Sequence, residues 1–514
     1  MAAPPKFGDY EAQRHWMEVT THLPLGRWYG DWPPDNPASW WGLDYPPLSA
    51  LQSWVHGLAV RALDPAGIAL GTSRGHESPW SKAVLRGTVL LSDLAVFFPA
   101  ALAAVAAFYP GASPSAAAAR LTALLAVLLN PAALLIDHGH FQYNCISLGL
   151  AASAAAVAAR GDHTRSALPG VLSSILFTAA VHHKQMAAYY APAFLGHLAG
   201  RALQAGRAKG PGAAAWRVGA YGAAVLATAT LCWAPFYLWA EDGDGLAGLG
   251  RVLGRLAPLG RGLFEDYVAN FWCATHPALK WKARFSQAAL AKAAAGLTVA
   301  AATPAALHQA LHPSRRGLLY CMASSAFAFY TFSYQVHEKS VLLPLLPLTL
   351  LAPAEPGLAA WLPALACFSM WPLLRRDGLG LAYAAALLAW AALVTPSWPA
   401  APASTQQRAG WAVAGGSTLV AAALHAAREW VAPPPALPWL WDGLTVGFAF
   451  LHIVAAAMYV NWRLWSVPAD GEVVVDDRKK EKEGGGRRAG PVPKQPPVSH
   501  LTPRRAGPRS RRAP

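Results

Sequence analysis

Apolar residues form long runs over most of this chain, and short polar clusters separate one run from the next. A helix needs about 20 apolar residues to cross the hydrocarbon core of a bilayer, whereas strands of a transmembrane barrel alternate over roughly ten-residue segments. The runs do not alternate, so the pattern predicts an all-α polytopic membrane protein with thirteen transmembrane helices. We place these helices near residues 86–108, 121–136, 143–159, 167–182, 186–203, 214–238, 288–308, 317–333, 340–353, 357–373, 379–396, 411–426 and 439–464.

The composition supports the membrane assignment. Hydrophobic residues make up 54% of the 514 residues and charged residues 13%. The charged share is about half that of soluble proteins. We divide the chain into a polar segment at 1–85, a multi-span transmembrane domain at 86–466 and a disordered basic tail at 467–514.

The tail carries much of the net charge of +15. From Asp470 to Pro514, twelve Lys or Arg outnumber six Asp or Glu, and the Pro- and Gly-rich composition buries too little apolar surface to fold. We expect a solvated cytoplasmic tail beside anionic lipid, with a nucleic-acid-binding arm as the less favoured alternative. No nucleic-acid partner is therefore expected.

The opening stretch from Gly8 to Leu48 differs from the rest of the chain. It mixes carboxylates, arginine, histidine and tryptophan, and it has few aliphatic residues. Such a segment is poorly suited to lipid and cannot build a core of its own. It is predicted to lie over another part of the molecule.

Four further polar clusters interrupt the apolar runs, at 136–144, 181–186, 261–273 and 335–340. Two, four, six and eight predicted helices separate them from the opening stretch, and every interval is even. All of these clusters should therefore emerge on one face of the membrane. The connections on the opposite face are short and basic, so the positive-inside rule predicts that face to be cytoplasmic and the clusters to be lumenal or extracytoplasmic.

Metal binding is not expected. The five cysteines are scattered without a CxxC pair, which is typical of small buried residues. His138 and His140 are two positions apart and would point in different directions on a helix. We expect neither a metal site nor another cofactor.

The polar clusters carry the candidate chemistry, because ionisable residues at membrane depth are functional-site hypotheses by default. Transfer of a group from a phosphate needs one carboxylate to accept a proton and cations to hold the departing phosphate. Asp9 or Asp44 fits the first role. The cations that fit the second are Arg14, Lys184, His337 and Lys339. Each cluster has a structural alternative as a hydrogen-bonded helix end.

Six motifs, in order from about residue 7 to about residue 373, resemble one known family. They are GDYEAQRHWMEVT, WWGLDYPPLSA, DHGHFQYN, KQM, RGLFEDYVANFWC and FSYQVHEKS. The chain resembles the endoplasmic-reticulum dolichyl-phosphoglucose-dependent α-1,3-glucosyltransferases, polytopic enzymes of the C type that build the lipid-linked oligosaccharide. The motif EAQRHW resembles the corresponding motif of the enzymes that add the first glucose. The sister enzymes that add the second glucose share LDYPP and HFQYN but look more like EVHRNW at that position.

The resemblance implies a reaction and its partners. The donor would be dolichyl phosphate β-glucose, the acceptor a high-mannose oligosaccharide on dolichyl diphosphate, and the product an inverted α-1,3 linkage, without a nucleotide sugar. The enzyme would lie in the endoplasmic-reticulum membrane, in contact with membrane lipid, with its site on the lumenal side. The sequence carries no signal for an oligomeric state.

The resemblance also implies residue roles. Asp9 matches the general base of the family, with a helix N-cap as its structural alternative. The expected substrate-binding residues are Asp44, Arg14, His15, His140, Gln142, Lys184, Gln185, Glu265, Asp266, His337, Glu338 and Lys339.

Several of these substrate-binding roles have alternatives. Arg14 and His15 are equally suited to hydrogen bonds that tie the loop to the membrane domain, and Asp44 to fixing its own loop. Glu338 and Lys339 could pair locally. Glu265 and Asp266 could lie on a lumenal loop without contacting the glycan.

Two further alternatives concern the whole chain. A transporter would use the same ionisable clusters as a substrate pathway, although no internal repeat is visible. An assembly subunit without catalysis would tolerate loss of Asp9. Family members carry one transmembrane helix ahead of the GDY motif, so we expect fourteen spans, with both termini cytoplasmic, where that helix is present.

Overall fold

The computed structural model describes residues 8–161, 165–256, 262–264, 267–394 and 405–467. These residues are mainly helical, and β pairing among them is limited to isolated bridges of Trp32 with Asn36 and of Phe264 with Val336. The predicted basic tail lies outside the described residues from position 468 onward.

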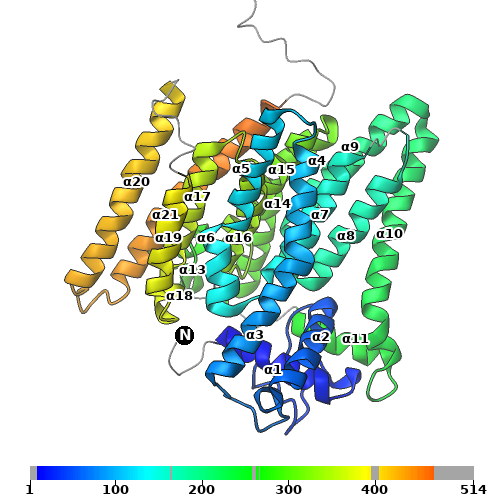
Figure 1. Ribbon diagram of the computed structural model, residues 1–514, viewed down its shortest axis with the longest axis vertical. Helices are drawn as coiled ribbons and strands as arrows, with labels where there is room; N and C mark the ends of the chain where they lie inside the picture. Colours follow the sequence, from blue (N-terminus) through cyan, green and yellow to red (C-terminus); the bar gives the residue numbers. More distant parts are fainter. Residues whose placement is uncertain (1–7, 162–164, 257–261, 265–266, 395–404, 468–514) are drawn as a thin grey trace, which may run out of the picture. The chain divides into compact units, whose positions relative to one another are not determined.

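The helices are arranged as Figure 1 shows. Up to residue 209 they are α1 (Gly8–His22), η1 (Leu25–Arg27), α2 (Pro47–Leu63), η2 (Pro65–Ile68), α3 (Pro79–Ser92), η3 (Asp93–Phe97), α4 (Phe98–Phe108), α5 (Pro114–Leu128), α6 (Pro131–Leu134), η4 (Leu135–Phe141), α7 (Asn144–Arg160), α8 (Leu168–His183), η5 (Gln185–Tyr190) and α9 (Ala191–Lys209). The remainder are α10 (Pro211–Leu238), α11 (Gly245–Leu256), α12 (Phe271–Leu279), α13 (Trp281–Arg284), α14 (Gln287–Leu311), α15 (Arg315–Phe332), η6 (Glu338–Val341), α16 (Leu342–Leu350), α17 (Pro356–Ser369), α18 (Trp371–Arg376), α19 (Gly380–Val394), α20 (Thr405–Trp430) and α21 (Leu440–Trp465).

Within the described residues, each of the thirteen predicted runs overlaps one helix or consecutive helices. Among the described residues, six helical segments are long and apolar enough to cross a membrane, and four shorter apolar helices accompany them. The six are Pro79–Phe108, Pro114–Phe141, Pro211–Leu238, Gln287–Leu311, Arg408–Trp430 and Leu440–Trp465. The prediction of a polytopic, all-helical membrane protein is thus confirmed, whereas the number of thirteen spans stays a prediction.

Small residues allow the helices to approach closely. Gly196 and Gly200 lie one turn apart on α9 and face α14. A Cβ atom at Gly196 would lie 2.3 Å from the carbonyl oxygen of Ala306, and one at Gly200 would lie 2.7 Å from that of Ala310. This spacing of two glycines is the small-residue pattern of close membrane-helix pairs. Any larger residue at either position would push α9 and α14 apart.

Exposed apolar side chains are abundant on helices α10 and α20. Leu226 and Leu231 of α10 are exposed, as are Leu419 and Val420 of α20. Such exposure would promote aggregation in water but is favourable against lipid. The pattern therefore agrees with a lipid-facing surface on these helices.

The opening stretch folds against the rest of the chain, as its shortage of aliphatic residues predicts. α1 and α2 lie with α11 at one end of the helical bundle (Figure 1). Trp16, Trp28 and Tyr29 share an apolar cluster with Phe236 of α10 and Val252 of α11. The aromatic residues of this stretch thus supply the apolar contact that fastens it to the helices.

Candidate active site

A cavity of about 720 Å³ lies where the opening stretch meets the polar loops between helices. It is lined by Asp9, Ala12, Gln13, Trp16, Ala38, Trp41, Gly42, Asp44, Tyr45, Gln142, Gln185, Met186, Ala188, Tyr189, Arg255, Leu256, Phe329, Ser333, Tyr334, Gln335, His337 and Lys339. Of the predicted site residues, Asp9, Asp44, Gln142, Gln185, His337 and Lys339 are therefore together in one cavity.

Asp9 is the point at which these segments meet. It lies in the first turn of α1, and its Oδ2 atom is 2.5 Å from His140 Nε2 and 2.6 Å from Gln142 Nε2. Lys339 Nζ donates to the same oxygen. The even spacing of the polar clusters predicted one membrane face for these residues, and the structure brings their side chains into contact.

The two oxygens of the Asp9 carboxylate have different surroundings. Every side-chain bond recorded for this carboxylate among the described residues ends on Oδ2. The side chain is 26% exposed, and it lines the cavity. Three donors therefore hold Oδ2 of a carboxylate that also borders the cavity.

Nearby charge keeps Asp9 ionised. Burial raises its pKa, but the positive charges of Lys339 and His140 and the hydrogen bonds from both outweigh that effect. The pKa of Asp9 is held well below its usual range. The carboxylate thus carries its negative charge at any physiological pH.

Behind Asp9, a chain of hydrogen bonds orients its partners. His140 Nδ1 pairs with the buried carboxylate of Asp377. Lys184 Nζ donates to Gln142 Oε1 and to Asn144 Oδ1, each at 2.7 Å. Gln142 accepts from Lys184 through its oxygen and donates to Asp9 through its nitrogen. The predicted residue Lys184 therefore contacts the site through Gln142.

The sequence DHGHF adopts a π-helical turn, η4, that aims His140 at Asp9. Phe141 ends this turn with a φ of 84°, a left-handed conformation rare for a bulky residue. Arg86 of α3 donates to the carbonyl oxygens of His138 and Gly139, at 3.0 and 3.1 Å. π-helical turns occur frequently at functional sites, because they re-aim side chains.

The carboxylate of Asp137 joins this turn to the next helix. It accepts from the backbone N–H of Asn144 at 3.2 Å and of Cys145 at 2.8 Å. These donors belong to the first turn of α7 and have no partner within the helix. Asp137 therefore has a structural role, which fixes the segment carrying His140 and Gln142.

Glu338 lines a different cavity from its neighbour Lys339. That cavity has a volume of about 420 Å³ and also contains Arg375, Arg376 and Arg428. Arg428 forms an ion pair with Asp442 at 2.5 Å. The two predicted residues Glu338 and Lys339 thus belong to two separate hollows of the protein.

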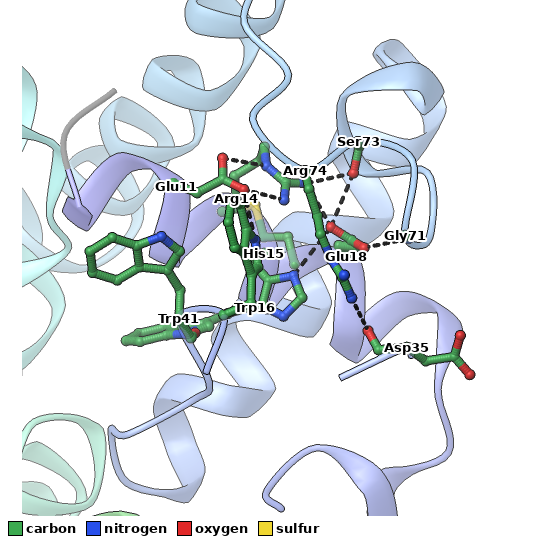
Figure 2. Close-up of polar contacts among 12 residues, drawn as sticks. Glu11, Arg14, His15, Trp16, Glu18, Asp35, Trp41, Gly71, Ser73 and Arg74 are labelled. Carbon is green, nitrogen blue, oxygen red and sulfur yellow. Dashed lines mark hydrogen bonds and ion pairs between the residues drawn. The ribbon is translucent and has the colours of Figure 1, made fainter. Parts of the chain in front are cut away.

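Arg14 and His15 do not line the active-site cavity, although both were expected to contact substrate or to tie down the loop. Both are fully buried beside Glu11 and Glu18. Arg14 Nη2 is 2.7 Å from Glu11 Oε1, and Arg14 Nη1 is 2.7 Å from Glu18 Oε2 (Figure 2). Ser73 accepts a further bond from Arg14 at 2.5 Å. We refer to Glu11, Arg14 and Glu18 as the α1 ion cluster.

The α1 ion cluster fastens two loops to the helix that carries Asp9. The N–H groups of Gly71 and Gly75 donate to Glu18 Oε1 at 2.7 Å and to Glu11 Oε1 at 3.1 Å. Trp40 Nε1 also donates to Glu11 Oε1, at 3.2 Å. The cluster therefore sets the position of Asp9 relative to its surrounding loops.

Glu18→Gln is expected to destabilise the protein equally at pH 7 and at pH 5. Burial raises the pKa of Glu18, but the hydrogen bond from His15, the charge of Arg14 and the N–H of Gly71 lower it to about 2. A lowered pKa gives stabilisation that is complete above the unfolded pKa of about 4.3 and is lost as the pH falls from there through the folded value. Thermal unfolding of the detergent-solubilised protein checks this, and a difference that already shrinks between pH 7 and pH 5 would contradict it.

Glu265 and Asp266 lie outside the described residues. Within the described part of the chain, no group of three His, Cys, Asp or Glu side chains is arranged to hold a metal ion. Four of the five cysteines are buried, and Cys273 is partly exposed. Sequence reasoning missed the cavity residues Trp16, Trp41 and Arg255, and it missed Asp377.

Comparison with known proteins gives consistent matches over most of the chain. Residues 1–459 match the profile of the ALG6, ALG8 glycosyltransferase family. The chain is 41% identical over 478 residues to a probable dolichyl pyrophosphate Man9GlcNAc2 alpha-1,3-glucosyltransferase of Arabidopsis thaliana, covering 90% of this chain and 85% of that protein. It is 40% identical over 394 residues to the Saccharomyces cerevisiae protein named dolichyl pyrophosphate Man9GlcNAc2 alpha-1,3-glucosyltransferase, covering 75% and 68%. The Gallus gallus protein of that name is 38% identical over 387 residues, covering 75% and 72%.

Proposed function

The chain belongs to the ALG6, ALG8 glycosyltransferase family, and from this premise we propose that it transfers glucose from dolichyl phosphate β-glucose to Man9GlcNAc2 on dolichyl diphosphate. The new bond is an α-1,3 linkage, and the glucose is the first one added. The acceptor is the one in the names of the relatives from Arabidopsis thaliana and Saccharomyces cerevisiae. The donor follows from the resemblance of the six sequence motifs.

The observation that carries the proposal is the position of the Asp9 carboxylate, which is hydrogen-bonded to other site residues. Oδ2 is held by Lys339, His140 and Gln142, and Asp9 itself lines the cavity. A general base must be positioned within hydrogen-bond reach of the proton that it takes. Asp9 fulfils this requirement for a hydroxyl group in the cavity.

In the proposed reaction, Asp9 Oδ1 accepts the proton of a mannose hydroxyl. The hydroxyl oxygen attacks the anomeric carbon of glucose from the face opposite the phosphate. The bond between that carbon and the phosphate oxygen breaks, and its electron pair leaves with dolichyl phosphate. A single displacement of this kind inverts the β linkage of the donor to the α linkage of the product.

Lys339 and His337 are the proposed contacts of the donor phosphate. Both line the cavity, and Lys339 Nζ donates a hydrogen bond to Asp9. A phosphate beside Lys339 would partly neutralise the positive charge of Lys339, so that this charge would lower the pKa of Asp9 less. The pKa of Asp9 then rises towards that of an effective base, because bases act best when their pKa approaches the working pH.

We place all these residues on one face of the membrane and assign that face to the lumen of the endoplasmic reticulum. The short basic connections of the other face support the assignment through the positive-inside rule. The transporter alternative is less well supported, since the matched family is one of glycosyltransferases over residues 1–459.

Acceptor specificity separates the proposal from its main alternative, addition of the second glucose. With dolichyl phosphate glucose, the purified protein is expected to glucosylate Man9GlcNAc2 on dolichyl diphosphate and to leave the monoglucosylated acceptor unchanged. The reactive hydroxyl of the correct acceptor is already occupied in the monoglucosylated one. Product glycans are identified by mass spectrometry, and UDP-glucose serves as the control donor that should give no product.

Two outcomes would overturn this assignment. Transfer to the monoglucosylated acceptor alone would identify the protein as a sister enzyme of the second step. Transfer from UDP-glucose at the same rate would contradict the lipid-linked donor.

A further inference from the structure

Trp41 is an exposed tryptophan on the wall of the active-site cavity that the proposed reaction does not use. Its side chain is 46% exposed, although the residues that follow it, Gly42 and Leu43, are buried. It lines the cavity together with Asp9 and Trp16. Packing in the protein core therefore does not account for a tryptophan at this position.

The backbone at Trp41 is left-handed, with a φ of 46°. A bulky residue in this conformation is strained and persists only when its surroundings hold it. Here the surroundings do so. Trp16 Nε1 donates to the carbonyl oxygen of Trp41 at 2.8 Å, and Arg255 Nη2 donates to that of Gly42 at 2.7 Å. Backbone strain of this kind gathers at ligand-binding positions.

The loop around Trp41 is also tied to the helix that carries Asp9. Trp16 and Glu11 are both on α1, and Glu11 accepts from Trp40 Nε1. The Trp16 ring packs edge-on against that of Tyr45, with centroids 5.0 Å apart. Trp16 and Trp41 lie together beside the α1 ion cluster (Figure 2). Trp41 is therefore placed at a fixed position relative to Asp9.

The position of Trp41 assigns it to one of the two substrates. Lys339 and His337 reach the cavity from the connection between α15 and α16, whereas Trp41 reaches it from the opening stretch. The acceptor hydroxyl must lie between the base and the donor carbon, because it gives its proton to the base while its oxygen attacks that carbon. With the donor phosphate beside Lys339, the acceptor sugar occupies the side of the cavity formed by the opening stretch.

A pyranose ring suits this surface. One face of a mannose unit presents mainly C–H groups, and an indole offers a rigid, flat apolar surface with a negative face. Aromatic walls with a few polar groups are typical of small-ligand sites. Gln13 and Asp44 line the same cavity and supply polar atoms for sugar hydroxyls.

We propose that Trp41 is an acceptor-binding residue, whose indole stacks on a pyranose ring of the mannose-rich oligosaccharide and holds it beside Asp9. This inference rests on the proposed glucosyl transfer and deepens it, because it separates the acceptor side of the site from the donor side.

Steady-state kinetics with each substrate varied in turn tests the proposal. Trp41→Ala is expected to raise the KM for Man9GlcNAc2 on dolichyl diphosphate by about tenfold, as is usual for truncating an aromatic anchor. The KM for dolichyl phosphate glucose should stay within about twofold. Trp41→Phe retains a flat ring and is expected to restore most of the affinity for the acceptor.

Trp41→Gly separates binding from folding. Glycine adopts a φ of 46° without strain, so this variant is expected to unfold at nearly the wild-type temperature and still to show the raised acceptor KM. Trp54→Ala is the matched control, because Trp54 is 41% exposed on α2 and does not line the cavity. Its KM values should match those of the wild type.

An unchanged acceptor KM in Trp41→Gly and Trp41→Ala, or a rise confined to the donor KM, would overturn the inference. Either result leaves glucosyl transfer by the wild type intact. Absence of transfer by the wild type with both acceptors would instead contradict the proposed function itself.

Discussion

Asp9→Asn is expected to lower the rate of glucose transfer by about a thousandfold, within the range that general-base catalysis contributes. The amide has nearly the shape of the carboxylate and can still accept a bond from Lys339. It cannot take the proton of the attacking hydroxyl. Transfer is measured with the purified protein, saturating dolichyl phosphate glucose and Man9GlcNAc2 on dolichyl diphosphate.

Asp35→Asn is the matched control for this variant. Asp35 belongs to the same stretch but does not line the cavity, so its substitution should leave the rate within about twofold, as for a surface change. Transfer by Asp9→Asn at the wild-type rate would refute Asp9 as the base and leave Asp44 as the other carboxylate among the described residues that line the cavity.

The acid side of the pH profile gives a second check on Asp9. Its pKa is held well below the usual range, because Lys339 and His140 outweigh the effect of burial. As the pH falls from 7 to 5, Asp9 therefore stays ionised in the free enzyme. The value of kcat/KM, which reports the free enzyme, is expected to show no loss from Asp9 in this interval.

Parity predicted a shared membrane face for Asp9, Gln142 and Lys339, whereas their contact depends on how the helices pack. An even number of helices between two polar clusters places them on one side of a membrane, whatever the packing of the helices. The contacts of Asp9 Oδ2 with groups 133 and 330 positions away follow this rule. The number of membrane spans stays a prediction.

The spacing of Glu11, Arg14 and Glu18 already predicts that Arg14 pairs with these two carboxylates on one helix face. Glu11, Arg14 and Glu18 are three and four positions apart, which puts them on one face of a helix. Their joint burial follows once that face meets the loop containing Gly71 and Ser73. The positive charge of Arg14 suggested a phosphate ligand, whereas the helix period indicates an internal ion cluster.

Asp377 and Trp41 could not have been found in this way. The bond between Asp377 and His140 joins residues 237 positions apart, and neither neighbour of Asp377 marks it as buried. The left-handed backbone of Trp41 depends on Trp16 and Arg255, which are distant in sequence. Both features arise from tertiary contacts that leave no local pattern.

The α1 ion cluster leads to the second large expected effect. Arg14→Met is expected to lower the free energy of unfolding by about 3–5 kcal/mol, because it leaves buried carboxylates without a counter-charge. Arg14 is completely buried and binds both Glu11 and Glu18. Thermal or denaturant unfolding of the detergent-solubilised protein measures the change.

Arg27→Met provides the control at the surface. Arg27 pairs with Glu241 at 2.6 Å, but the two side chains are 38% and 26% exposed. Exposed pairs contribute about 0–1 kcal/mol, because water and salt screen them. A loss in Arg14→Met no greater than that in Arg27→Met would show that the α1 ion cluster does not hold the opening stretch in place.

A triple variant separates the charge of Arg14 from its packing. Glu11→Gln and Glu18→Gln, added to Arg14→Met, remove the two carboxylates that the single change leaves unpaired, so the triple variant is expected to recover part of the lost stability. The bonds from Gly71 and Gly75 can persist, since the glutamine oxygens still accept them. Asp9 lies on the same helix, so transfer activity should follow stability in these variants. Recovered stability without recovered transfer would show that the ionised cluster also orients Asp9.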